Sequence, residues 1–487
     1  IKKMSYTDKN WTQEVHQKAK IIATVGPASR EKGILIELIK AGADVFRLNF
    51  SHGTHEDHQK TIDMVREINA ELGTHIALLQ DLQGPKIRVD QVKNGGVEII
   101  EGQTLIITTN DVLGTKDKVS TSYKLLAKDV NIGDSILIDD GNLEVKVTSV
   151  QGEDVHTEVV YGGALKSRKG INLPNTVVSA PSLTEKDHMD LEYGLTQNLD
   201  WVALSFVRKA SDIIELREKM EDAGSRTKII AKVEKPEALE NIDEIIAATD
   251  GVMVARGDLG VEIPGEQVPV WQKKIIKKCN QSGKPVIVAT QMMESMVDNP
   301  RPTRAETNDV ANAILDGTDA VMLSAESASG KYPVEAVRAM ANTIANIEHA
   351  GSAFYNKKND FDNLGEGSKL SDMLIKSACA LVEDSDAKAM VTMSKSGFSG
   401  YRVAMYRPNC PIFLVTSNKA LLTQMNLVWG VKGLFYDKET SINDTLSDIE
   451  AILLEKSLMT KGDIYITTSS MPKHWDGHAN MIKIKEI

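Results

Sequence analysis

The sequence predicts an α/β protein, built on a (β/α)8 TIM barrel that carries an inserted small β-barrel domain and a C-terminal open α/β sheet domain. Three observations support this fold class. Apolar runs of strand length alternate eight times with amphipathic stretches of helical period. Charged and polar residues follow the apolar runs, where barrels place their active sites. A block of short β-branched alternations interrupts the pattern, and another α/β pattern follows it.

Composition is that of a globular protein with more than one domain. The chain has 487 residues, of which 41% are hydrophobic and 26% charged, and this length is typical of about three domains. Its net charge of -11 argues against a nucleic-acid partner, because binding a phosphate backbone needs clustered lysine and arginine. It leaves room for local basic pockets that take small phosphates.

The three cysteines are widely spaced and form no CxxC pair, so they indicate neither a disulfide framework nor a zinc site. They fit a reducing cytosol, and a cytoplasmic location is expected. No apolar run approaches the roughly 20 residues of a membrane span, so no membrane partner is expected. Residues 1–17 form an N-terminal segment without the apolar core of a secretion signal, and Met4 is a candidate for the true start.

The barrel is predicted over residues 18–85 and 182–350. Its first unit is the apolar run Lys20–Val25, followed by a Gly-Pro turn and a helical stretch. The later units repeat this order, with continuous apolar strands of the kind found in buried parallel sheets. The eight expected strands are 20–25, 43–51, 75–84, 199–207, 228–234, 251–260, 285–292 and 320–326.

The insert over residues 86–181 has a different pattern, with β-branched alternations and Gly-Asp and Asp-Gly turns between them. We expect a small all-β domain above the active face, acting as a mobile lid. After residue 350 a polar, glycine-bearing stretch indicates a linker, and residues 351–487 are predicted to form the C-terminal domain with about five strands. Its Ser/Gly loop, Ser394–Gly400, is either a phosphate-binding nest or an ordinary helix cap using Ser396 or Ser399.

The stretch Lys228–Glu234, KIIAKVE, places Lys232 and Glu234 two residues apart and therefore on one face of a strand. A surface ion pair at a strand end is the competing interpretation. Polar residues recur at the ends of the other predicted strands, and this recurrence favours an active site over a surface ion pair. Glu234 and Asp258 end adjacent predicted strands, and two carboxylates without a neighbouring histidine or thiolate suit Mg²⁺ or Mn²⁺.

Arg47 and Lys232 add positive charge to the same face, so that with the metal they favour a multiply charged anion. Phosphoryl transfer needs little beyond such positioning and charge neutralisation. A structural ring of ion pairs could use the same residues. The sequence contains no GxxxxGK[ST] motif and no HRD or DFG set, so P-loop and protein-kinase mechanisms are not supported.

Several longer motifs resemble one family. They are KIIATVGPAS, ADVFRLNFSHG, GPKIR, SRKGINLP, IIAKVE, DGVMVARGDLGVEIP, KPVIVATQMMESM, PRPTRAETNDVANAILDGTDAVMLSAESASGKYP and SKSGFSG, in order from about residue 18 to residue 415. Together they resemble the pyruvate kinase family, whose fold has the same β insert and C-terminal domain. The resemblance implies transfer of the phosphoryl group of phosphoenolpyruvate to ADP, giving pyruvate and ATP.

The resemblance also implies roles for named residues. Glu234 and Asp258 would ligate the divalent metal, while Lys232 would stabilise the phosphoryl group in transfer instead of pairing with Glu234. The implied catalytic residues are Lys232, Arg47, Thr290 and Ser324, and the implied substrate-binding residues are Arg47, Lys232, Ala255, Arg256, Gly257, Asp258 and Thr290. The implied nucleotide-binding residues are Asn49, His52, Arg88 and Lys169.

Lys86 follows Gly-Pro where the K⁺-dependent form of the family has a glutamate. The resemblance therefore implies the K⁺-independent form. In the K⁺-dependent form the residues matching Asn49, Ser51 and Asp81 hold the cation, and here the Lys86 ammonium would replace its charge. K⁺ is accordingly not expected as a cofactor.

Family members are usually homotetramers, and the loop residues Ser394, Lys395, Ser396, Gly397 and Ser399 resemble a sugar-phosphate effector site. Whether an effector exists, and which one, stays open. Two other functions fit parts of the same pattern: a metal-dependent aldolase or lyase on a related barrel, and a silent sensor of a phosphorylated metabolite. The β insert and Lys232 favour the kinase.

Overall fold

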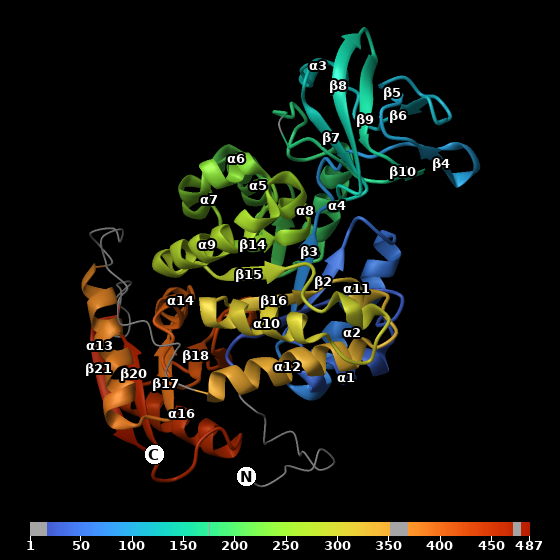
Figure 1. Cartoon of the computed structure of the whole chain (residues 1–487). Coiled ribbons are helices and arrows are strands. Elements are labelled where there is room, and N and C mark those ends of the chain that lie inside the picture. The colour runs from blue at the N-terminus through green and yellow to red at the C-terminus, as the bar shows by residue number, and fades with distance from the viewer. Residues whose placement is uncertain (1–16, 175, 351–368, 471–478) are drawn as a thin grey trace.

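The barrel predicted from the eight apolar runs is present in the computed structural model of the chain, which describes residues 17–174, 176–350, 369–470 and 479–487 (Figure 1). Eight parallel strands close in the order β1-β16-β15-β14-β13-β12-β3-β2. Their bounds are β1 Lys20–Val25, β2 Val45–Asn49, β3 Ala77–Asp81, β12 Trp201–Leu204, β13 Lys228–Val233, β14 Gly251–Ala255, β15 Val286–Ala289 and β16 Ala320–Leu323.

Continuous apolar sequences form these strands because both of their faces are buried. Every barrel strand contributes to an inner core, which includes Trp201 and Met253, while the outward residues pack under the helices. One expected strand was too long: the run 251–260 divides into β14 and the short helix α8, Arg256–Glu262. Beyond Ala255 the buried residues Leu259 and Glu262 lie three apart, which is helical spacing.

Helices surround the barrel as the amphipathic stretches predicted. Three of them, α2, α4 and α10, begin with a capping box in which Thr54, Thr184 or Thr303 accepts from the backbone amide three residues later. The α-helices are α1 Lys32–Ala41, α2 His55–Leu72, α4 Glu185–Thr196, α5 Ala210–Asp222, α6 Pro236–Glu240, α7 Ile242–Ala248, α8, α9 Val268–Ser282, α10 Arg304–Asp316, α11 Ala325–Ala328 and α12 Pro333–His349; short 3₁₀ turns are η2 Gly265–Gln267 and η3 Glu294–Val297.

The insert forms a separate β domain with its own apolar core. A six-stranded sheet runs β11-β7-β8-β9-β5-β6, and β10 pairs with β4. The strands are β4 Gly96–Ile99, β5 Thr104–Thr108, β6 Lys118–Ser120, β7 Ser135–Ile138, β8 Leu143–Gln151, β9 Asp154–Tyr161, β10 Gly163–Lys166 and β11 Ile171–Asn172, with the short helices η1 Lys93–Gly95 and α3 Leu126–Asp129.

The C-terminal domain contains the expected five strands in the order β19-β18-β17-β20-β21, with β21 antiparallel to β20. The strands are β17 Ala389–Met393, β18 Ile412–Thr416, β19 Val431–Phe435, β20 Ile464–Ser469 and β21 Met481–Glu486. Its helices are α13 Lys369–Ser385, α14 Phe398–Met405, α15 Lys419–Gln424, η5 Met425–Leu427 and α16 Ile442–Glu455. The expected linker at 351–368 and nearly all of the N-terminal segment lie outside the described residues.

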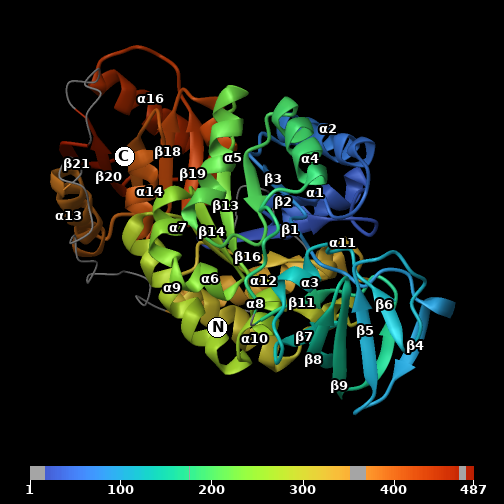
Figure 2. The ribbon, with the colours of Figure 1, turned by 90° about the horizontal axis from the view of Figure 1, so that it is seen from above.

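The two smaller domains lie on opposite sides of the barrel (Figures 1 and 2). The C-terminal domain covers the end at which the barrel strands begin. There Leu427 of η5 joins the inner core of the barrel, and the indole of Trp201 donates to the carbonyl of Gln424 at 3.1 Å. Arg407 forms a buried bidentate pair with Asp319, both of its oxygens 3.0 Å from the guanidinium.

The described part of the chain contains no helix that is both long and apolar enough to cross a bilayer. Cys279, Cys379 and Cys410 are buried free thiols, in agreement with the expectation that the cysteines form no disulfide framework.

Candidate active site

Arg47, Asp81 and Lys232 meet where barrel strands β2, β3 and β13 end. The Arg47 Nε donates to Asp81 Oδ2 at 2.6 Å, and its Nη1 donates to the Thr24 hydroxyl at 3.0 Å. Lys232 Nζ lies 3.2 Å from Asp81 Oδ1. Burial raises the pKa of Asp81, but the charges of Lys232 and Arg47 outweigh burial and hold the pKa below its ordinary value. Asp81 is therefore the anion that fixes both cations.

Lys232 is also bound to Glu234 and to Ser205. Its ammonium donates to the Ser205 hydroxyl at 2.8 Å and lies 3.0 Å from Glu234 Oε1. Burial lowers the pKa of Lys232, yet the charges of Asp81 and Glu234 more than offset this and raise it. The expectation that Lys232 and Glu234 do not pair with one another is therefore wrong for this structure. Glu234 is 1% exposed, and a carboxylate so buried needs a cationic partner.

Glu234 and Asp258 lie near one another at the ends of neighbouring strands β13 and β14, as the sequence predicted. Burial raises the pKa of Glu234, and the charge of Asp258 adds to this effect while Lys232 opposes it. Asp258 Oδ1 is 2.9 Å from Lys86 Nζ. Each carboxylate thus already has a cation beside it.

These residues fit a divalent cation. The donors are hard carboxylate oxygens, and they lie close enough for the charge of Asp258 to raise the pKa of Glu234. Hard oxygen ligands are the ones that Mg²⁺ and Mn²⁺ prefer. Among the residues that the structure describes, no group of three or more His, Cys, Asp or Glu side chains could hold a metal. Water and substrate would have to supply the other ligands.

Thr290 follows β15 in a left-handed backbone conformation, with φ of 66°. Its hydroxyl accepts from the Gly257 amide at 2.7 Å, and its carbonyl accepts from Arg256 at 2.9 Å. Arg256 is held in turn by Asp309, with both of the nitrogen–oxygen distances at 2.7 Å. Left-handed conformations of β-branched residues cost free energy and persist where surrounding contacts enforce them. Arg256 and Gly257 supply those contacts.

Ser324 and Ala255 end strands β16 and β14 on the same face. The Ser324 amide donates to Glu326 Oε2 at 2.7 Å, and the Met293 amide donates to the other oxygen of Glu326 at 3.2 Å. Burial raises the pKa of Glu326, against the backbone donors that lower it.

The four residues expected to bind nucleotide lie in two places. On the barrel, Asn49 Oδ1 accepts from the Ser51 amide at 3.1 Å, and the His52 carbonyl lies 3.0 Å from a ring nitrogen of His58. On the insert, Arg88 and Lys169 lie on paired segments, and Lys169 is 2.7 Å from Asp139. No hydrogen bond or ion pair joins the two places within the described ranges. A nucleotide would have to bridge the barrel and the insert.

The Ser/Gly loop of the C-terminal domain connects β17 to α14. The Ser394 hydroxyl accepts from the Gly397 amide at 3.0 Å, and Ser396 accepts from the Phe398 amide at 3.4 Å. Asn418 donates to the Lys395 carbonyl at 3.4 Å, and Ser399 is buried. Gly397 caps the helix with φ of 86°, so the cap itself is a glycine and neither Ser396 nor Ser399. An anion site in this loop stays a prediction.

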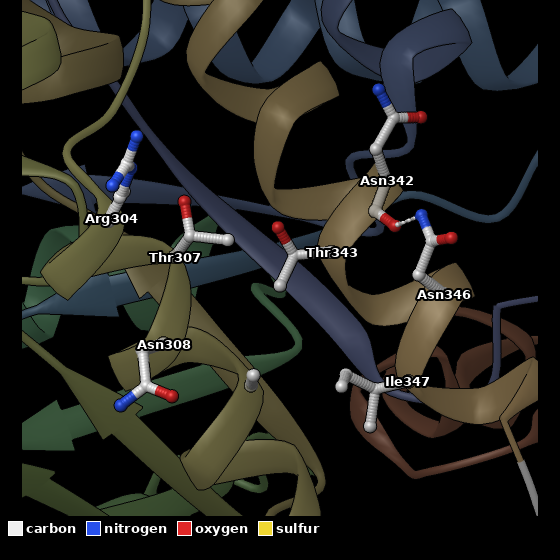
Figure 3. A pocket seen from close by; sticks show the side chains of 8 residues that line it. Arg304, Thr307, Asn308, Asn342, Thr343, Asn346 and Ile347 are labelled. Atoms are coloured by element: carbon white, nitrogen blue, oxygen red, sulfur yellow. Dashed lines mark hydrogen bonds between the residues drawn. The ribbon is translucent and has the colours of Figure 1, made fainter.

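A groove of about 500 Å³ lies elsewhere, on the outside of the barrel between α10 and α12 (Figure 3). Carboxamide and hydroxyl side chains dominate its lining, which consists of Arg304, Thr307, Asn308, Ala311, Asn342, Thr343, Asn346 and Ile347. None of these residues was predicted to act in catalysis, and the groove contributes nothing to the cluster at the strand ends.

Sequence reasoning missed three buried polar residues beside the carboxylates: Asn172, Lys235 and Glu262. Lys235 directly follows Glu234, and Glu262 lies four residues after Asp258, on the same face of α8. The adjacency of Lys235 and Glu234 was a usable signal, whereas the spacing of Asp258 and Glu262 has meaning only once α8 is known to be a helix. Nothing in the sequence marks Asn172 as their partner.

Comparison with known proteins agrees with the fold. Residues 16–337 match the family model described as pyruvate kinase, barrel domain, and residues 372–485 match pyruvate kinase, alpha/beta domain. The chain is 45% identical over 483 residues to a pyruvate kinase of Geobacillus stearothermophilus, covering 97% of this chain and 80% of the relative. It is 42% identical over 481 residues to one of Sporosarcina psychrophila, with the same coverage.

A solved structure gives the same result in three dimensions. The crystal structure of a pyruvate kinase from Cryptosporidium parvum superposes with a TM-score of 0.89 at 36% identity, covering 97% of this chain and 96% of that one. Both domain models, the curated relatives and the shared fold lead to one conclusion: the chain belongs to the pyruvate kinase family.

Proposed function

We propose that the protein transfers the phosphoryl group of phosphoenolpyruvate to ADP, giving pyruvate and ATP, at the strand-end cluster of Arg47, Lys232, Glu234 and Asp258. One observation carries this assignment. Two cations and two carboxylates from the ends of three barrel strands, β2, β13 and β14, converge on one face of the barrel, where a triply charged substrate needs charge neutralisation.

In this proposal Arg47 and Lys232 bind the phosphate of phosphoenolpyruvate, with Asp81 fixing the orientation of both. The amides of Ala255, Arg256 and Gly257 lie at the start of α8, where they can donate to the substrate carboxylate. For Gly257 this requires its amide to leave the Thr290 hydroxyl, to which it donates here. Glu234 and Asp258 would hold Mg²⁺ or Mn²⁺. Such a cation would supply positive charge against the negative charge that develops during the transfer.

The phosphoryl group leaves the enol oxygen of phosphoenolpyruvate and bonds to a terminal phosphate oxygen of ADP. Lys232 stabilises the negative charge that develops on the enolate. A proton then reaches the methylene carbon of the enolate from the side of Thr290 and Ser324, through water. Asn49 and His52 on the barrel and Arg88 and Lys169 on the insert hold the nucleotide between the two domains.

The Lys86 ammonium supplies the positive charge for which the K⁺-dependent form uses a bound cation, so K⁺ is not required. Lys86 lies 2.9 Å from Asp258, which supports a place for this charge in the active site. Asn49, Ser51 and Asp81 match the residues whose oxygens bind K⁺ in the K⁺-dependent form, and they are retained here without that function.

The same proposal covers assembly and regulation. The protein works as a cytoplasmic homotetramer, and a phosphorylated sugar binds at Ser394, Lys395, Ser396, Gly397 and Ser399. Support comes from the family assignment of both domains. Light scattering after size exclusion measures the assembly, and thermal shifts against a panel of sugar phosphates identify an effector.

A lactate dehydrogenase-coupled assay tests the reaction. Pyruvate should form from phosphoenolpyruvate only when ADP and Mg²⁺ are both present. Pyruvate formation without ADP would indicate a lyase or phosphatase, and no pyruvate at all would indicate a protein that binds the metabolite without turnover. Either result would refute the proposed transfer to ADP.

A further inference from the structure

Helix α8 carries two carboxylates on one face, since Asp258 and Glu262 lie four residues apart. The inserted domain contacts this face near both of its ends. Near its start Lys86 Nζ is 2.9 Å from Asp258 Oδ1, and in its last strand, β11, Asn172 Nδ2 donates to Glu262 Oε1 at 2.9 Å. The inserted domain is therefore held to the barrel through the helix that carries Asp258.

The turn between β7 and β8 approaches the same helix, because a methyl group added at Gly141 would be 3.9 Å from Val261 Cγ1. A movement of the inserted domain cannot leave α8 unaffected unless the polar contacts at Asp258 and Glu262 both break.

Glu262 is tied to the other carboxylate strand as well. Lys235 directly follows Glu234, and its Nζ lies 2.7 Å from Glu262 Oε1. The Lys235 side chain is 11% exposed and that of Glu262 is 0% exposed. Glu262 Oε1 accepts from both Lys235 and Asn172, while the buried Oε2 has no hydrogen-bond partner in the described part of the chain.

A buried ion pair of this kind contributes little to stability, because desolvation of both charges offsets their attraction. It does fix geometry, since neither partner can move without leaving a charge buried and unpaired. Here it fixes the end of β13, which carries Glu234, relative to α8, which carries Asp258.

We propose that Glu262, Lys235 and Asn172 are positioning residues that set the separation of Glu234 and Asp258 and link it to the position of the inserted domain. The inference rests on the proposed function, which assigns those two carboxylates to the divalent cation. Removing residues that orient the metal ligands without touching the metal typically lowers metal affinity by 10- to 100-fold.

The test is Mn²⁺ binding to the full-length apoprotein, followed by electron paramagnetic resonance of free Mn²⁺. In the double variant Lys235→Met/Glu262→Met apolar side chains replace the ion pair, so that melting temperature should stay the same or rise. Mn²⁺ affinity should nevertheless fall about tenfold. A folded double variant that binds Mn²⁺ as tightly as wild type would overturn the proposal.

Two single variants keep the test decisive if the double variant does not fold. Asn172→Ala removes one neutral donor from the inserted domain and should weaken Mn²⁺ binding about threefold, at the lower end of such effects. Lys235→Arg keeps the charge and should bind Mn²⁺ nearly as wild type does. If Asn172→Ala bound Mn²⁺ as tightly as wild type, the link between the inserted domain and the metal site would be refuted. A tenfold loss of Mn²⁺ affinity in Lys235→Arg would show that the positive charge at position 235 does not position the carboxylates.

Lys20→Met is the matched control. Lys20 is a buried lysine at the opposite end of the barrel, 3.5 Å from Asp44, so that its loss should lower stability and leave Mn²⁺ affinity unchanged. Equal loss of affinity in this control would show a general structural effect and overturn the proposal. Pyruvate formation by wild type is measured in parallel, so failure of the proposed reaction is separable from failure of the positioning role.

Discussion

Lys232 is a largely buried lysine that keeps its charge because three oxygen-bearing side chains surround it. Asp81 and Glu234 lie 3.2 and 3.0 Å from its ammonium, and Ser205 accepts at 2.8 Å. Burial alone would favour the neutral amine, but the two carboxylates raise the pKa of Lys232. A lysine held in this state is a fixed positive charge that a developing anion can use without reorganisation.

Lys232→Met and Glu234→Ala should separate the two functions of this pair. Without Lys232, kcat should fall about 100- to 1,000-fold, the usual loss when one charge-stabilising donor is removed. Mn²⁺ affinity should not fall, because Glu234 loses its competing ammonium. Glu234→Ala should instead weaken Mn²⁺ binding at least about tenfold.

The coupled pyruvate assay and electron paramagnetic resonance of Mn²⁺ give the two readouts. If Lys232→Met lost metal binding as severely as Glu234→Ala does, the lysine would be a structural support of the metal site.

Lys86→Glu should make the enzyme dependent on K⁺. Wild type is expected to be active in K⁺-free buffer, because the Lys86 ammonium already provides the positive charge. In the variant a carboxylate faces Asp258, and activity should return only when K⁺ is added. Initial rates at 0 and roughly 100 mM KCl, near physiological ionic strength, with tetramethylammonium as the control for ionic strength, measure this. A strong K⁺ requirement in wild type would contradict the prediction.

At the residue scale, sequence predicted those site residues that end apolar strands. Arg47, Lys232 and Glu234 stand out there because a charge beside a buried strand is costly without a function or a partner. Side-chain contacts between residues far apart in the chain could not be predicted from the sequence. Asn172 binds Glu262 across 90 positions, and the ion pair between Lys232 and Glu234 was wrongly rejected because it depends on side-chain burial.

At the element scale, the barrel strands were predictable because each is buried on both faces and most of its residues are apolar. Helix α8 was not, since its two glycines and its short length give no helical period, and the run 251–260 looked like one strand. The insert was recognised from its alternation. How it attaches to α8 depends on contacts between distant segments, which periodicity does not encode.

The inserted domain should respond to substrate as a lid. It has an apolar core separate from that of the barrel, so it can move as a unit about its two connections. Amide hydrogen exchange in residues 86–181 should slow when phosphoenolpyruvate and Mg²⁺ bind, because ligands held by both domains favour closure. Exchange in the core strands β17 and β18 serves as the internal reference. Unchanged exchange in the insert would contradict the lid.

At the scale of the whole molecule, the barrel and the C-terminal domain share polar contacts as well as an apolar core. Asp200, just before β12, accepts from the Leu78 amide at 2.8 Å and from the hydroxyl of Thr423 in α15. Burial raises the pKa of Asp200 to about 6, against these two hydrogen bonds, which lower it. The junction of the two domains therefore holds a carboxyl group that titrates near neutrality.

The contribution of Asp200 to stability should consequently rise as pH falls from 8 to 5. The folded pKa of Asp200 exceeds its unfolded value, so its stabilising contribution is complete below about pH 4 and is lost as pH rises through about 6. Between pH 8 and pH 5 this group should add about 1.5 kcal/mol to the free energy of unfolding.

Asp200→Asn should abolish that part of the pH dependence, as measured by urea unfolding at the two pH values. Asp243→Asn, at an exposed ion pair with Lys278, is the control and should leave the pH dependence unchanged. An unaltered pH dependence in Asp200→Asn would contradict the assignment.

Leu427 completes the inner core of the barrel from the C-terminal domain, and this has a consequence for synthesis on the ribosome. The last barrel strand ends at Leu323, about 100 residues earlier in the chain. At about 5 to 20 residues per second, the nascent barrel stays open at one end for roughly 5 to 20 seconds after its final strand is made. During that interval the uncovered end of its inner core exposes Trp201 and its neighbours, which makes the unfinished chain a natural client for chaperones that bind apolar surface.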